Sequence, residues 1–376
     1  MVSLAHAVQQ DPIRISLLTC APGSEIYSLF GHTAIRYENE TTGEDLIYNY
    51  GVFSFNTPNF VFRFVKGETD YQLGVIPYEY FEYSYAKRGS SVYQQTLNLT
   101  ESEKKQLKHL LDENYAPQHR IYRYNYFYDN CTTRARDKIE ESISGKVVYP
   151  EGSKGLSFRK IIHQYTQGHD WGEWGIDFCL GAEADAEIDM RLQQFAPFYM
   201  LESARKAYIQ TGDSIRPLIS GEAKIVDVSP KSEADFLISP WMAVILLLAI
   251  TLFVEFYQIK QGKIIWVWDL LLFGFQGLAG CIVAFLFFFS VHPTVGSNWL
   301  LWAFNPLYLF YLPVLIFRAI KGHKDRFHLV NIVYLTFFII IMPFVEQEFQ
   351  PTMLPLVLIF LLCSIGHIIM YNRKSY

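Results

Sequence analysis

Residues 128–139 read YDNCTTRARDKI and contain the feature from which the fold can be inferred. The polar residues Asp129 and Asn130 precede Cys131, and both residue types commonly cap the first turn of a helix. The following residues predict a helix that begins at or beside the cysteine. A thiol placed there lies at the positive end of the helix dipole, among backbone N–H groups that have no partner within the helix. Because this environment favours the thiolate, Cys131 is a candidate nucleophile.

A thiolate nucleophile needs a histidine brought close to it by the fold. His32 is the candidate, because it opens the β-branched, strand-like run HTAIRY and a strand holds an imidazole rigidly. A third polar group should orient the ring. Asn49, in the next strand-like run, can accept a hydrogen bond from a ring N–H, and Tyr48 and Tyr50 are alternatives.

Other interpretations of these residues stay open. Cys131 alone is compatible with a structural thiol, and His32 with a core histidine. Cys20, in LLTCAPG, is a second candidate nucleophile, but it ends a strand and lacks a helix terminus. Cys20 and Cys179 are also a possible disulfide pair.

The chain contains 5 cysteines, too few for a disulfide scaffold, and has no CxxC pair. The acidic stretch GAEADAEID lacks histidine and EF-hand spacing, which favours a solvated turn. We therefore predict no metal site and no cofactor. The formal net charge of −5 and the lack of a basic, aromatic patch argue against nucleic acid as a partner.

The composition changes abruptly from Trp241 onward. Apolar runs of a length that spans a bilayer follow one another, which predicts a five-helix transmembrane domain over 237–376; the runs are 241–257, 266–289, 299–320, 327–345 and 353–371. The first, third and last charged segments around these runs carry lysine and arginine, so they are expected in the cytoplasm. The C-terminus is then cytoplasmic, and the preceding residues are exported. Ala5-His6-Ala7 fits the end of a signal peptide, so residues 1–8 are interpreted as its remnant.

The exported part mixes strand and helix patterns. Residues 9–150 contain five strand-like runs, IRISLLTC, HTAIRYEN, DLIYNYGVF, DYQLGVIPY and SVYQQTLNL, and two helical runs, of which the first starts with a capping box. Residues 151–236 are amphipathic and are predicted to form a helical, membrane-proximal extension. The aromatic run PNFVFRFVKGETDYQLG is compatible with docking on lipid or with a sheet core.

The order of the motifs, a strand histidine before an Asn-Cys helix start, is similar to that of the permuted papain-like NlpC/lecithin:retinol acyltransferase superfamily. A closer resemblance covers nearly the whole chain. The runs LLTCAPGSEIYSLFGHTAIRY, IYNYGVFSFNTPNFVFRFVKGETDYQLG, YNYFYDNCTTRARDKI and HPTVGSNWLLWAFNPL resemble the Lnb-type lipoprotein N-acyltransferase family. This resemblance implies an α+β permuted papain-like thiol-enzyme domain followed by an all-α bundle of five transmembrane helices.

The resemblance also implies an activity. Members move a fatty acyl chain through a cysteine thioester to the N-terminal amine of the diacylglyceryl cysteine of bacterial lipoproteins. By this resemblance Cys131 is the nucleophile and His32 the base. Further substrate contacts are expected from residues inside the matching motifs and from an asparagine at membrane depth, namely Arg36, Asn130, Arg134 and Asn305.

The implied partners are the lipoprotein N-terminus and membrane phospholipid, in the bacterial inner membrane with the catalytic domain on the periplasmic side. The acyl donor is either a phospholipid or the lipoprotein's own glyceryl chain. The main alternative is an extracytoplasmic cysteine amidase or endopeptidase that acts on the cell wall. A non-enzymatic alternative is an exported sensor or assembly factor with an inert thiol.

Overall fold

The computed structural model describes residues 12–56, 58–229 and 236–373 and divides the chain into two compact units. The first comprises Met1–Leu156 and Glu187–Glu233, and the second Ser157–Ala186 and Ala234–Tyr376. The predicted boundaries 9–150 and 151–236 are therefore wrong. The predicted extension is no separate domain, because its C-terminal part adds a strand to the first unit while residues 157–186 pack within the second. The predicted remnant at residues 1–8 lies outside the described residues.

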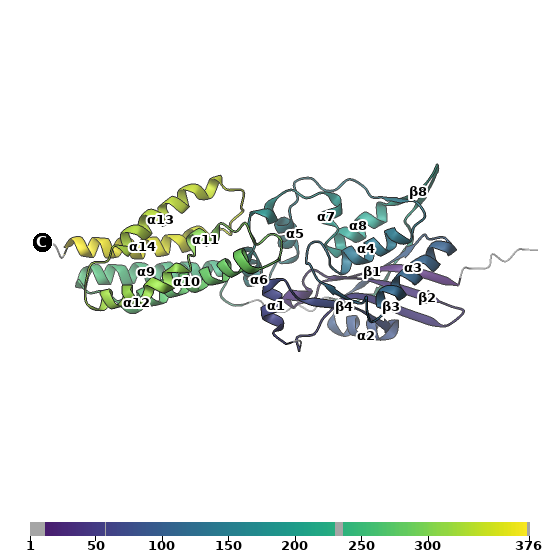
Figure 1. The fold of residues 1–376 in the computed structure, drawn as a ribbon, viewed down its shortest axis with the longest axis horizontal. Helices are drawn as coiled ribbons and strands as arrows, with labels where there is room; N and C mark the ends of the chain where they lie inside the picture. Colours follow the sequence, from purple (N-terminus) through teal and green to yellow (C-terminus); the bar gives the residue numbers. More distant parts are fainter. Residues whose placement is uncertain (1–11, 57, 230–235, 374–376) are drawn as a thin grey trace, which may run out of the picture. The chain divides into compact units, whose positions relative to one another are not determined.

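The first unit is built on a seven-stranded sheet (Figure 1) with the order β10-β5-β1-β2-β3-β4-β6. Each neighbouring pair is antiparallel, and the strands are β1 (Ile13–Cys20), β2 (His32–Asn39), β3 (Glu44–Val52), β4 (Asp70–Pro77), β5 (Val92–Leu97), β6 (Ile121–Arg123) and β10 (Ile219–Val226). A smaller sheet has the order β7-β8-β9 and contains β7 (Lys146–Val148), β8 (Tyr208–Thr211) and β9 (Ser214–Pro217).

Helices cover both faces of the large sheet. One face packs on α3 (Glu101–Tyr115) and α4 (Cys131–Ser142) through a core that includes Leu17, Ile35, Leu107 and Ile139. The opposite face packs on α2 (Tyr78–Arg88) through Phe81. The remaining helices of this unit are shorter or lie apart from these layers: η1 (Ile26–Ser28), α1 (Phe60–Lys66), α7 (Met190–Gln193) and α8 (Pro197–Lys206).

The predicted strands of residues 9–150 are confirmed, and so is the capping box of α3, in which Thr100 accepts from the backbone of Glu103. The run from Met190 to Ile209, which lies in the predicted helical extension, is not one continuous helix. It is broken between α7 and α8, where Pro197 occupies the first turn of α8 and cannot continue a preceding helix. β10 was not predicted, because most of its residues are exposed and show no apolar alternation.

The second unit is helical, and its described residues include five helical segments long and apolar enough to cross a membrane. These spans are Pro240–Gln261, Trp266–Phe289, Leu300–Ile320, Phe327–Phe344 and Met353–Asn372, in agreement with the predicted runs. The corresponding elements are α9 (Pro240–Gln261), α10 (Trp266–Phe289), α11 (Leu300–Ala303), α12 (Leu307–Ile320), α13 (Phe327–Ile341), η3 (Met342–Phe344) and α14 (Met353–Arg373). The chain is thus a multi-pass membrane protein with an N-terminal domain of helices and sheets, as the sequence predicts.

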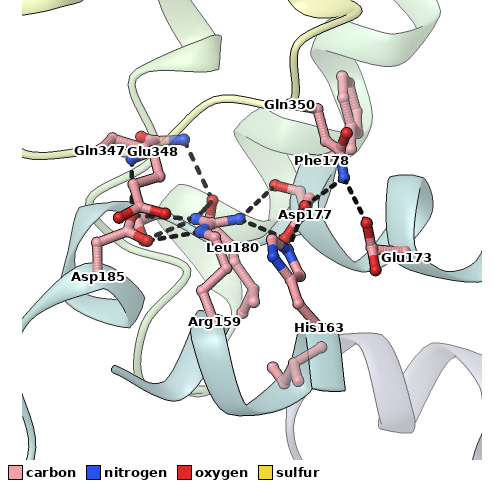
Figure 2. Close-up of polar contacts among 12 residues, drawn as sticks. Arg159, His163, Glu173, Asp177, Phe178, Leu180, Asp185, Gln347, Glu348 and Gln350 are labelled. Carbon is pink, nitrogen blue, oxygen red and sulfur yellow. Dashed lines mark hydrogen bonds and ion pairs between the residues drawn. The ribbon is translucent and has the colours of Figure 1, made fainter. Parts of the chain in front are cut away.

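Residues 157–186 form α5 (Phe158–Tyr165), α6 (Asp170–Cys179) and η2 (Ala182–Asp185). Figure 2 shows the ion-pair network that holds them, which we call the Arg159 network. The buried guanidinium of Arg159 donates to Asp177 Oδ1 at 2.7 Å and to Asp185 Oδ1 at 2.6 Å. The other oxygen of Asp177 accepts from the Gln350 side chain at 2.6 Å and lies 2.8 Å from His163 Nε2. This network ties α5 and α6 to the loop between α13 and α14.

Replacing Arg159 with methionine is expected to destabilise the second unit by about 3–5 kcal/mol, because two buried carboxylates lose their cationic partner. Lys160→Met is the matched control. Lys160 is its neighbour on α5 and forms a long, exposed ion pair with Glu348 at 3.9 Å, so its loss should change stability by less than about 1 kcal/mol. The measurement is the unfolding transition of both variants in the same detergent. Equal transitions would show that the Arg159 network does not stabilise the unit.

Candidate active site

Cys131 is the first residue of α4, as the sequence predicts, and Asn130 is its N-cap. The Asn130 side-chain oxygen accepts from the backbone N–H groups of Thr132, at 2.8 Å, and Thr133, at 3.0 Å. Its amide group donates to the carbonyls of Tyr126 and Phe195. Asn130 is buried and fully used in holding the helix start, so its geometry supports positioning of the thiol rather than the expected substrate contact.

The cap also limits which backbone N–H groups in the first turn of α4 can stabilise an oxyanion. The N–H groups of Thr132 and Thr133 already donate to Asn130. Within the described residues, the backbone N–H of Cys131 donates to no acceptor. The first amide of α4 is therefore the helix N–H that remains for a substrate oxygen.

His32 is the first residue of β2. Its Nε2 lies 2.5 Å from the side-chain oxygen of Asn49 on β3, the adjacent strand. This contact leaves Nδ1 as the ring nitrogen that can serve the thiol. The alternatives Tyr48 and Tyr50 alternate with Asn49 along the strand and point to the other face, where their hydroxyls donate to Asp112 and Asn114 on α3. Asn49 is therefore the group that orients the ring.

Cys131 and His32 shift each other's pKa in opposite directions. Burial opposes ionisation of Cys131, but the charge of His32 and hydrogen bonds from His32, from the Thr33 backbone and from Thr132 outweigh burial and lower the thiol pKa. Burial likewise lowers the pKa of His32, yet the Cys131 thiolate and the hydrogen bonds to Cys131 and Asn49 raise it above its ordinary value. Both shifts favour the pair of thiolate and imidazolium over the pair of neutral side chains.

The other thiols of the two units lack these features. Cys20 is fully buried, and desolvation raises its pKa to about 12 although its hydrogen bond with Tyr85 lowers it. Burial raises the pKa of Cys179 to about 11. All five cysteines are free thiols. The suggested Cys20–Cys179 disulfide is thus absent, and a thiol that ionises only near pH 12 makes a poor nucleophile.

Gly51 on β3 lies beside Cys131 in a backbone conformation that favours glycine. It has a φ of +84° at an irregularity of β3, and a Cβ there would lie 3.6 Å from the Cβ of Cys131 and 3.8 Å from the ring of Tyr124. A glycine in a strand marks such a bulge or close approach. The glycine at the end of the strand-like run LIYNYG is the sequence signal for this feature. The backbone N–H of Thr33 donates to the Cys131 thiol and helps to lower its pKa. Sequence reasoning missed this donor, because no motif marks a backbone N–H.

The two arginines of the matching motifs are occupied by internal partners. Arg36 donates to Asp45 through two nitrogens, at 2.8 and 2.7 Å, and stacks on Tyr78 at 3.5 Å. Arg134 forms a two-pronged pair with Asp129, at 2.6 and 2.7 Å, and lies over a tyrosine ring. This geometry favours structural roles for both. Asn305 belongs to the second unit, where its side chain accepts from the Leu307 N–H and starts α12.

An exposed apolar surface is formed by the segment between β1 and β2, which precedes His32, and by the segment that follows β3. We call it the aromatic patch, and its members have exposed fractions of 48–71%: Ile26, Tyr27, Phe55, Val61, Phe62 and Phe64. Tyr27 and Phe55 contact one another and share the ring of Phe53, which packs against the core that includes Cys131. Three of its members, Val61, Phe62 and Phe64, belong to the aromatic run that is compatible with lipid docking. Exposed apolar side chains gathered in this way mark an interaction surface.

Gly31 fixes the backbone in front of His32. Its φ is +76°, and a Cβ there would lie 2.5 Å from the carbonyl oxygen of Cys20. Gly31→Ala is therefore expected to destabilise the first unit by at least about 2 kcal/mol and to displace the imidazole. Gly43→Ala is the control, because Gly43 also has a positive φ, +73°, but meets nothing within 4 Å, and it should cost only about 1 kcal/mol. Unfolding and thiol-alkylation rates of both variants test this; equal effects would contradict it.

Two family models match the chain over its two halves. The Lnb N-terminal periplasmic domain matches residues 3–164. The Lnb transmembrane domain matches residues 231–375. No curated protein and no solved structure matches.

Proposed function

Because the chain belongs to the Lnb family, we propose that it is a membrane-bound thiol acyltransferase of bacterial lipoproteins. It moves a fatty acyl chain, through a thioester on Cys131, to the N-terminal amine of the diacylglyceryl cysteine. The observation that carries this proposal is the pairing of Cys131 with His32. A thiol of lowered pKa at a capped helix start faces an imidazole of raised pKa that Asn49 orients. The arrangement has the parts of a nucleophile, an acid–base group and an orienting group.

In the first half-reaction the Cys131 thiolate attacks the carbonyl carbon of a fatty acyl ester. A carbon–sulfur bond forms, and the negative charge moves to the carbonyl oxygen, where the Cys131 N–H donates to it. As this intermediate collapses, the bond between the acyl carbon and the glyceryl oxygen breaks. The His32 imidazolium gives its proton to the departing alkoxide, which leaves a neutral imidazole and a thioester.

In the second half-reaction the α-amine of the lipoprotein cysteine attacks the thioester. His32 accepts the proton that the amine loses as the amide bond forms. The carbon–sulfur bond then breaks and restores the thiolate beside the imidazolium. Neither half-reaction uses water as a reactant. Water that reached the thioester would hydrolyse it, so exclusion of water decides between acyl transfer and hydrolysis.

The substrates lie in a bilayer, which agrees with a catalytic unit joined to membrane spans. A tether to the membrane raises the effective concentration of lipid at the site. The aromatic patch supports contact with lipid, because its exposed rings adjoin the segments that carry His32 and Gly51. We place the protein in the bacterial inner membrane, with the catalytic unit in the periplasm and the C-terminus in the cytoplasm, from the positive connectors around the spans.

Mass spectrometry of lipoprotein N-termini tests this function. Cells that lack the gene should accumulate lipoproteins with a free α-amine, and the intact gene should restore the N-acyl form. If the N-termini do not change while peptidoglycan fragments do, the alternative of a cell-wall amidase or endopeptidase is correct. A second comparison uses the first unit alone: acyl transfer should need the membrane spans, whereas a cell-wall hydrolase should not.

A further inference from the structure

A second group of reactive side chains lies inside the membrane unit, and the proposed reaction does not use it. Asp269 on α10 and Cys363 and His367 on α14 are each fully buried, and Glu255 on α9 is 6% exposed. Ionisable side chains within a membrane span are costly to bury and commonly mark a functional site. These four residues come from the consecutive helices α9 and α10 and from the distant helix α14, so packing of the bundle brings them together.

The geometry gathers three kinds of metal-ligating atom at one place. Cys363 and His367 are one helical turn apart on α14, so their side chains share a face. Opposite them, Asp269 Oδ1 lies 2.9 Å from His367 Nε2 and 3.4 Å from Cys363 Sγ. Ligand atoms of the three residues all lie within 4.8 Å of one another. This spacing allows one small ion to contact all three after sub-ångström adjustments of the side chains.

Glu255 on the third helix, α9, is the candidate for a fourth ligand, although its carboxylate lies outside the three-residue group defined by the 4.8 Å spacing. Its carboxylate lies against the backbone of α14 at Gly366, where a Cβ would stand 1.9 Å from Oε2. Only glycine permits this approach, which places a carboxylate between the turns that carry Cys363 and His367. The Cys363 thiol is also in hydrogen-bonding contact with Glu255. The set is thus one sulfur, one imidazole nitrogen and two carboxylates.

Two buried polar atoms of this group lack a hydrogen-bond partner among the described residues. Asp269 Oδ2 and His367 Nδ1 are buried and have no hydrogen-bond partner there. A buried carboxylate oxygen without a partner costs free energy, and a membrane interior supplies no water to replace the partner. A bound cation would satisfy the carboxylate oxygen and reduce the buried negative charge at once.

We propose that Glu255, Asp269, Cys363 and His367 bind a divalent transition-metal ion of the zinc type. Thiolate and imidazole ligands select such an ion over magnesium or calcium, which prefer oxygen alone. Four protein ligands fill a tetrahedral shell, which is the pattern of structural rather than catalytic sites. The ion ties α9, α10 and α14 together, and its binding releases the thiol proton to solvent. The ligands lie toward the ends of the spans next to Lys260 and Lys263, which the positive-inside rule assigns to the reducing cytoplasm.

The test measures metal on the full chain purified in detergent without an affinity tag or chelator. Elemental analysis should find about one zinc-type ion per chain. Cobalt added to the metal-free protein should give a thiolate-to-cobalt charge-transfer band and the visible bands of a tetrahedral site. Cys363→Ser should remove the charge-transfer band, and His367→Ala should reduce bound metal at least about tenfold.

Two variants serve as matched controls. Cys281→Ser removes an exposed thiol of α10 and should leave the cobalt spectrum unchanged. His163→Ala removes a histidine of the second cluster with metal-ligating geometry, which contains Glu173 and Asp177, and should also leave bound metal unchanged. Wild-type protein without stoichiometric metal and without a thiolate-to-cobalt band would overturn the proposal, and so would loss of the metal in His163→Ala. The wild-type spectrum decides the question even if a ligand variant fails to fold.

Discussion

Cys131→Ser is expected to reduce lipoprotein N-acylation by at least about 10⁴-fold, the scale on which removal of a nucleophile acts in related acyl-transfer sites. The serine hydroxyl fits the position of the thiol. However, a hydroxyl ionises far less readily than a thiol, so the imidazolium that holds Cys131 as thiolate cannot hold serine as alkoxide. The measurement is the fraction of N-acylated lipoprotein N-termini in cells whose only copy carries the substitution.

The control for this variant is Cys281→Ser, which changes an exposed thiol of α10 in the same way and should retain full activity. Membrane levels of both proteins must be equal, since Cys131 is also part of the core of the first unit. N-acylation that persists in Cys131→Ser would remove this residue from the mechanism. Loss of activity in both variants would point to a fault of expression or folding.

Replacing His32 with alanine is expected to have a comparable effect on turnover and a distinct effect on the thiol. In the wild type the charge of His32 lowers the pKa of Cys131 against the opposing effect of burial. Without His32 the burial remains and the largest lowering cause is lost, so the pKa of Cys131 rises. The thiolate then forms only at higher pH, and alkylation of Cys131 at neutral pH should slow by about 10–100-fold.

The rate of alkylation by iodoacetamide across a pH series measures this shift. The wild-type profile should keep its reactivity at pH values below the ordinary thiol pKa, and the His32→Ala profile should move to higher pH. His109→Ala, an exposed histidine of α3, is the control and should follow the wild type. If the profiles of all three proteins coincide, the imidazole does not stabilise the thiolate, and the dyad as described is wrong.

The sequence predicted those parts of the site that rest on local rules. The start of α4 could be inferred because Asn130 has the side chain that caps a helix, and the thiol follows it directly. Asn49 was the leading candidate to orient His32 because its side-chain oxygen can accept from the ring N–H, but only the structure separates it from its tyrosine neighbours. The membrane spans were predictable because a bilayer demands long apolar runs.

What the sequence did not predict depends on contacts between distant segments. The strand β10 is mostly exposed and lacks alternation, so only its pairing with β5 identifies it. The roles of Arg36 and Arg134 could not be inferred either, because their partners Asp45 and Asp129 form ion pairs that motifs do not reveal. The proposed metal ligands were missed for the same reason. Cys363 and His367 have helical spacing, but Asp269 and Glu255 join them only through packing of the bundle.

The most direct test of the central claim is mass spectrometry of the peptide that contains Cys131 after the full-length protein meets an acyl donor without a free amine. Phospholipid and an N-acetylated diacylglyceryl lipopeptide, offered separately, also identify the donor. We predict one fatty acyl group on the Cys131 sulfur, removed by neutral hydroxylamine and absent from His32→Ala. An acyl group on a different residue, or turnover of the lipid with Cys131 unmodified in a rapidly quenched reaction, would contradict the account.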